Sequence, residues 1–69
     1  MAEVFLIRVT TDTGEHQVWA AAMPSEQGLQ TVLDAIPEGW TVSLLMRATA
    51  DEIAALALKP GEVRELPNA

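Results

Sequence analysis

The sequence contains no cysteine and only one histidine among its 69 residues. Without cysteine the chain can form neither a disulfide nor a thiolate zinc site, and it has no thiol nucleophile. A zinc site needs three or four protein ligands and a calcium site needs six to eight oxygen atoms, so His16 beside the turn acids Asp12 and Glu15 falls short of both. We therefore expect no bound metal and no cofactor.

Positive charge is also scarce, because Arg8, Arg47, Lys59 and Arg64 are the only basic residues and lie far apart in the sequence. Ten acidic residues give a net charge of −6. Nucleic-acid binding requires clustered Lys and Arg to neutralise phosphates, and an anionic membrane surface repels an acidic protein. We expect neither nucleic acid nor a membrane as a partner.

Long apolar runs are missing as well. The longest, at residues 4–7, is far shorter than the roughly 20 residues of a membrane-spanning helix. The opening Met1-Ala2-Glu3 lacks the basic stretch and apolar segment of a secretory leader. Together with the lack of cysteine, these features favour a cytoplasmic protein.

What the sequence does have is globular composition, with 49% apolar and 20% charged residues. This predicts one small domain over residues 1–69, with residues 61–69 as an extended tail. A domain of this size buries only about 60% of the surface of its unfolded chain, so its core stabilises it by only a few kcal/mol. Association with a second chain is the remaining common way to add buried surface.

Two strands open the chain. Residues 3–11 and 16–22 are rich in residues that suit strands, and the intervening Asp12-Thr13-Gly14 is typical of a hairpin loop. A three-residue loop places Trp19 opposite Ile7, whereas a four-residue loop turns Trp19 to the other face. The register stays open, although the position of Gly14 favours the shorter loop.

A helix is predicted over residues 24–36, after Pro24. Its apolar residues recur at helical spacing, and Gly28 in its interior suggests close packing on a sheet. A third strand follows at residues 40–47, with Trp40, Val42, Leu44 and Met46 on one face. Thr49 and Glu52 form a capping-box pattern that starts a second helix over residues 50–58. Residues 62–67 are extended, and whether they form a fourth strand stays open.

These elements predict an α+β fold of order β-β-α-β-α, with or without a short C-terminal strand. We expect a small single-layer sheet with two helices packed on one face. The other face would then have no cover. Trp19 adds a large side chain of the type enriched at protein interfaces. The candidate interface residues are therefore Val4, Leu6, Trp19 and Leu45.

No catalytic pattern emerges from the remaining residues. The acids lie mostly at helix starts and in loops, the two serines lie outside any nucleophile-elbow sequence, and the glycines do not form a phosphate-binding loop. The capped helix and the following residues 58–66 resemble the ends of short bacterial proteins, a resemblance that names no activity.

We therefore predict a small acidic, non-enzymatic protein-interaction module. Its partner would be a protein or a second copy of itself, as a homodimer or as a subunit of a larger assembly. The alternative is a small-ligand-binding protein or enzyme. Its site would be completed at a dimer interface by Arg8, His16 or Arg47.

Overall fold

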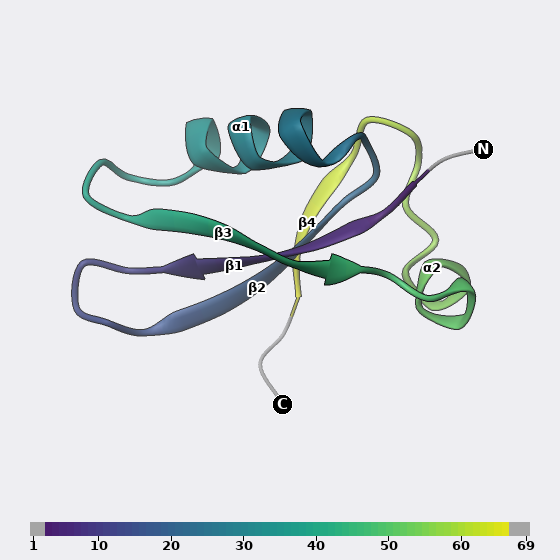
Figure 1. The fold of residues 1–69 in the computed structure, drawn as a ribbon, viewed down its shortest axis with the longest axis horizontal. Helices are drawn as coiled ribbons and strands as arrows, with labels where there is room; N and C mark the ends of the chain where they lie inside the picture. Colours follow the sequence, from purple (N-terminus) through teal and green to yellow (C-terminus); the bar gives the residue numbers. More distant parts are fainter. Residues whose placement is uncertain (1–2, 67–69) are drawn as a thin grey trace.

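The structure is a computed structural model, and it describes residues 3–66 of the chain. Six elements follow one another in the order β-β-α-β-α-β (Figure 1). They are β1 (Phe5–Thr10), β2 (His16–Ala21), α1 (Ser25–Ala35), β3 (Thr41–Arg47), α2 (Ala50–Leu56) and β4 (Val63–Leu66). The predicted α+β class and element order are confirmed, and part of the extended tail is a strand. Residues 67–69 of the tail lie outside the described residues.

The four strands form one antiparallel sheet in the order β3-β1-β2-β4. Between β2 and β3 the chain passes through α1, which runs alongside β3 in Figure 1, and β3 then lies on the far side of β1 from β2. A connection that skips one strand needs about a dozen residues, and the helix supplies them. The sheet edges are therefore β3 and β4.

The β1–β2 hairpin has the shorter of the two predicted loops. The Thr11 backbone N–H donates to the Glu15 carbonyl over 2.8 Å, which leaves three residues in the loop. Gly14 adopts a φ of +89°, a conformation that L side chains rarely adopt. This register places Trp19 opposite Ile7, so the sequence preference for that arrangement is confirmed.

The helix α1 covers one face of the sheet. Between the helix and the sheet lies a buried cluster, to which α1 contributes Val32 and the rest of the chain contributes Ile7, Val9, Ala21 and Met23. Gly28 faces this cluster so closely that a Cβ atom there would stand 3.1 Å from the Ala21 Cβ. The glycine therefore allows a close approach of helix and sheet, as the sequence predicted.

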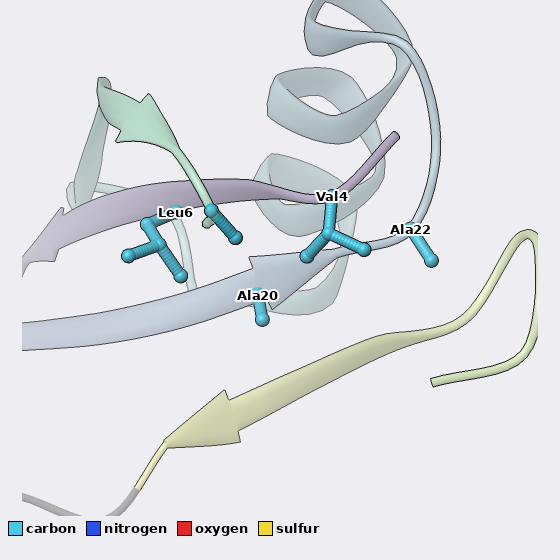
Figure 2. Close-up of a cluster of buried hydrophobic side chains, with 5 residues drawn as sticks. Val4, Leu6, Ala20 and Ala22 are labelled. Carbon is cyan, nitrogen blue, oxygen red and sulfur yellow. The ribbon is translucent and has the colours of Figure 1, made fainter. Parts of the chain in front are cut away.

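The expectation that both helices share this face is corrected by the structure. A second buried cluster lies on the opposite face, and Figure 2 shows four of its members pointing to the same side of the first two strands. Side chains of α2, and Leu58 after it, pack against that cluster, not against the α1 layer. The cluster is Val4, Leu6, Ala20, Ala22 and Ala48, and the half-buried residues packed against it are Val18, Leu45, Ile53, Leu56, Leu58 and Leu66.

The physical reason lies at the end of β3. The Ala48 N–H donates to the Val4 carbonyl over 2.8 Å, so the chain leaves β3 beside the start of β1. There Val4 and Leu6 require a cover, because an apolar side chain left in water forgoes the free energy of burial. The helix begins at once with the predicted capping box, in which the Thr49 side chain and Glu52 bond each other's backbone N–H groups.

The predicted alternation of β3 also needs a correction. Leu6 pairs with Met46 but Ile7 pairs with Leu44, which leaves Leu45 as an extra residue in a β-bulge. Leu44 therefore lies on the α1 face, while Met46 lies on the opposite face with Leu6. Leu45 packs against the second cluster. Strict alternation predicts Leu44 and Met46 on the same face of the sheet, whereas the extra residue places them on opposite faces.

Neither helix within residues 3–66 has the length and apolar character needed to cross a membrane.

Candidate functional site

The sheet face opposite α1 has two halves of different character. Its apolar half is the cluster that α2 covers, at the end of the sheet remote from the β1–β2 hairpin (Figure 1). Toward the hairpin the strands carry polar side chains, and α2 does not reach them. We call this second part the open half-face, and it consists of Arg8, Thr10, His16, Thr41 and Ser43. All of these are exposed except the half-buried Thr10.

The open half-face has a local origin in the sequence. Along β1 the residues that point away from α1 change from Leu6 to Arg8 and then to Thr10, so the apolar character ends halfway along the strand. Arg8 is the only charged residue among the five, in a chain whose net charge is −6. This half-face therefore lacks the negative charge that dominates the chain as a whole.

The outer edge of β3 adjoins the open half-face and is unusual for the edge of a sheet. Among the described residues β3 has one strand neighbour, β1, so its outer backbone groups are not paired with another strand. Leu44 is 45% exposed and Met46 is 55% exposed. The strand has seven residues, contains no acid and no proline, and carries its only charge at Arg47, the last position. We call Thr41–Arg47, with this outer side, the β3 edge.

The other edge differs in the features that discourage pairing. The strand β4 has only four residues, and two of them, Arg64 and Glu65, are charged and exposed. Short length and charged side chains are the usual protection of an edge strand against unwanted pairing. The β3 edge is longer and carries its one charge at its last position, so its protection is limited to Arg47 and the bulge at Leu45. The two edges are therefore unequal as places for another strand to dock.

The predicted interface residues do not form one open surface in a single chain. Val4 and Leu6 are buried in the second cluster, and Leu45 is half-buried against the same cluster. Trp19 lies on the opposite side of the sheet, half-buried with the α1 cluster, where its Nε1 donates to Gln17 Oε1 over 3.2 Å. The structure thus brings Val4, Leu6 and Leu45 together and separates Trp19 from them. The expectation of an uncovered patch at Val4 and Leu6 is corrected.

The three residues of the ligand-site alternative also lie apart. His16 and Arg8 are on the open half-face, where His16 Nδ1 lies 3.2 Å from Thr10 Oγ1. Arg47 is paired with Phe5 in the sheet, and its Cζ lies 5.6 Å from the centre of that ring. It also forms an ion pair of 3.2 Å with Glu3. Arg47 therefore lies on the other face, and the three side chains share no site within one chain.

A shallow hollow of about 400 Å³ lies where the chain enters α1. Its lining is mainly apolar, with Glu3 and Gln27 as the polar side chains, and Glu3 is held by Arg47. The hollow is lined by Glu3, Ala22, Met23, Pro24, Gln27, Pro60 and Gly61.

Among residues 3–66, no three His, Asp or Glu side chains are placed to hold a metal ion.

The segment that joins α2 to β4 is held by Glu62. Its Oε1 accepts from the Lys59 backbone N–H over 2.9 Å, and Arg64 lies 3.4 Å from its Oε2. These contacts, the Lys59 hydrogen bond foremost, hold the pKa of the Glu62 carboxyl below its ordinary value. Arg64 also donates to the Leu56 carbonyl over 2.9 Å, so it links the end of α2 to β4. This anchor keeps α2 and Leu58 over the apolar half-face.

Sequence reasoning missed the β3 edge as a candidate surface. A signal was present, because residues 40–46 contain no charge in a chain with ten acids. What could not be read was that β3 lies at the edge of the sheet, since strand order depends on contacts distant in sequence. The missed residues are Leu44 and Met46.

Comparison with known proteins gives no match: no protein-family model, no curated protein and no solved structure matches this chain. The β3 edge itself is therefore the feature from which a function is inferred.

Proposed function

We propose that the chain is a small acidic, non-enzymatic protein-interaction module, acting as a homodimer or as a subunit of a larger assembly. Its partner adds a strand to the β3 edge. The observation that supports this is the β3 edge itself: seven residues with no acid, and with Leu44 and Met46 largely exposed. An exposed edge strand with no proline and with its only charge at its last position is a template for pairing with another chain.

Strand addition would supply two kinds of stabilisation at this place. The partner's backbone would pair with the outer N–H and C=O groups of β3, and its side chains would cover Leu44 on one face and Met46 on the other. The second contribution matters for a domain this small, because its own core buries a limited share of its apolar surface. Docking at β3 would extend that core without rearranging α1 or α2.

A capture experiment with matched variants tests this proposal. The tagged chain is incubated with an extract of the cells that express it, together with an untagged, labelled copy of the same chain. Leu44→Lys places a charge at the centre of the β3 edge, whereas Leu33→Lys changes a leucine of similar exposure, 42%, on α1. Leaving a lysine in a desolvated contact should weaken binding roughly tenfold or more.

We expect the wild-type chain and Leu33→Lys to retain the same partner, and Leu44→Lys to lose it while its circular dichroism stays unchanged. Equal retention by all three chains would contradict a contact at β3. If only Leu33→Lys lost the partner, the contact would lie on α1, and the proposal of a contact at β3 would be wrong.

A further inference from the structure

The geometry points to a second copy of this chain as the strand that joins the β3 edge, antiparallel and about a two-fold axis at Ser43. This inference rests on the proposed function and names its partner. The two four-stranded sheets would become one continuous sheet. Both α1 helices would lie on the same side, because a two-fold axis perpendicular to a sheet does not exchange its faces.

The residues of β3 complement themselves in this register. Val42 would lie opposite the partner's Leu44, and both belong to the α1 face because they pair with residues of β1 that face α1. Ser43 would lie opposite itself on the other face. Thr41 would lie opposite the partner's Leu45, and both lie on the face away from α1. Every opposed pair therefore points to one side of the joined sheet, as antiparallel pairing requires.

Neighbouring registers do not meet this requirement over the same length. A two-fold axis at Leu44 would set Val42 opposite the partner's Met46, which the bulge has turned to the face of Leu6. An axis at Val42 would keep the faces matched but would pair only residues 41–43 within the strand. The bulge at Leu45 thus selects Ser43 as the centre of the longest matched register.

Charge also favours a second copy over an unrelated strand. The chain carries −6 overall, yet the residues that would pair, 41–45, contain no charged side chain. Two acidic chains can therefore approach each other here with the least repulsion. A basic partner would gain nothing from this edge, since β3 offers it no carboxylate. A strand with an uncharged segment and apolar residues on both faces suits the β3 edge, and residues 41–45 of β3 form such a segment.

In the joined sheet Arg8 would not oppose its counterpart at close range. Arg8 lies in β1 and pairs with Ser43 of β3, so two β3 strands would separate the two guanidinium groups. Strands lie about 4.8 Å apart, which places the two arginines roughly 14 Å from each other, beyond the screening length of about 8 Å at physiological salt. The open half-faces of the two copies would meet only along the row of Arg8 and Ser43 at the axis, because Thr41 of each copy would lie opposite Leu45 of the other.

Single-cysteine cross-linking tests the register directly, because the chain has no cysteine of its own. Opposed residues in an antiparallel pair have Cα atoms about 4.5–5.5 Å apart, within the span of a disulfide. Ser43→Cys should therefore form a disulfide-linked dimer in a glutathione redox buffer. A mixture of Val42→Cys and Leu44→Cys should give a linked heterodimer. Glu65→Cys, exposed on the opposite edge strand β4, is the matched control.

We expect roughly tenfold more linked dimer for Ser43→Cys than for Glu65→Cys at equal concentration, because a dimer raises the effective thiol concentration. Equal cross-linking of the two variants would overturn the inference. So would preferred linkage of Ser43→Cys to Glu65→Cys, which would indicate β3-to-β4 pairing and an open chain of copies. If cross-linking fails while Leu44→Lys still abolishes capture of another protein, the second copy is wrong and the interaction module stands.

Discussion

Gly28 of α1 lies so close to Ala21 of β2 that a Cβ atom at Gly28 would stand 3.1 Å from the Ala21 Cβ and 3.4 Å from Ile7 Cδ1. Alanine at a helix interior is favoured over glycine by about 1 kcal/mol. Overpacking a core costs about 1–3 kcal/mol, and Ala21 and Ile7 are both fully buried in central strands that cannot easily recede. We expect Gly28→Ala to lower the free energy of unfolding by about 1 kcal/mol, as measured by urea denaturation.

The Ala21→Gly variant provides the matching control. Without the Ala21 Cβ the added methyl group has room, so the loss caused by Gly28→Ala should shrink in that background. A stability gain from Gly28→Ala in the otherwise unchanged chain would show that helix propensity outweighs the contact. The close approach of α1 to the sheet would then be looser than the structure indicates.

Leu6 and Leu44 should respond very differently to the same substitution. Leu6 is 8% exposed beneath α2, whereas Leu44 is 45% exposed at the β3 edge. A lysine at Leu6 would bury an unpaired charge, so Leu6→Lys should unfold the domain, and Leu6→Ala should cost about 2–5 kcal/mol. Leu44→Lys should leave the thermal transition of the monomer, measured at low protein concentration, almost unchanged. Circular dichroism of both variants on heating measures the difference.

A folded Leu6→Lys chain with a normal melting temperature would contradict the cover that α2 provides. Leu56→Ala tests the contribution of α2 alone, because it shortens one side chain of the helix and leaves every strand residue in place. It should destabilise the domain by less than Leu6→Ala, because Leu56 is only half-buried.

The Glu62 carboxyl should make the stability of the domain depend on pH. Its folded-state pKa lies below the ordinary value because the Lys59 N–H donates to the carboxylate, with Arg64 as a further cause. The unfolded chain therefore binds more protons in the window between the two pKa values. The stabilisation is fully present above the ordinary pKa and is lost as the pH falls through the lowered one. The difference in free energy of unfolding between wild type and Glu62→Gln should therefore shrink as the pH falls through that window.

An NMR titration of the Glu62 side chain checks the cause. Arg64→Gln should raise the titration midpoint only partly, since the Lys59 backbone hydrogen bond remains the main reason for the low pKa. A midpoint at the ordinary carboxyl value in the unmodified chain would contradict the anchoring of this segment.

The features that sequence reasoning captured are those determined by a few neighbouring residues. The loop ending at Gly14 set the hairpin register, and Thr49 with Glu52 set the start of α2. Both depend on backbone geometry within a single turn. The element order followed from the alternating and helical patterns, which are local as well.

What could not be predicted depends on contacts between distant segments. The bulge at Leu45 arises where β3 meets β1, and it reverses the facing of Met46 without any glycine or proline to signal it. The face chosen by α2 depends on where the chain leaves β3, next to Val4. The predicted interface required Val4 and Leu6 to be uncovered. Because both are buried, the candidate site is the sheet edge and not the sheet face.

Salt should strengthen self-association through the β3 edge. Each copy carries a net charge of −6, while residues 41–45 contain no charge to attract the other copy. Long-range repulsion therefore opposes the dimer, and pairing at β3 adds no ion pair for salt to weaken. Raising the ionic strength from about 10 mM to about 150 mM shortens the screening length from about 30 Å to about 8 Å. Sedimentation equilibrium should show a several-fold lower dissociation constant at the higher salt.

The double variant Asp12→Asn, Glu15→Gln removes two negative charges at the exposed hairpin tip without touching β3. It should dimerise more tightly than the wild type at low salt and respond less to added salt, because less repulsion remains to be screened. Dissociation on adding salt would instead mean that attractive ion pairs hold the two copies together. Since the paired segment of β3 has no charges, such a result would place the contact elsewhere on the molecule and exclude the two-fold pairing at Ser43.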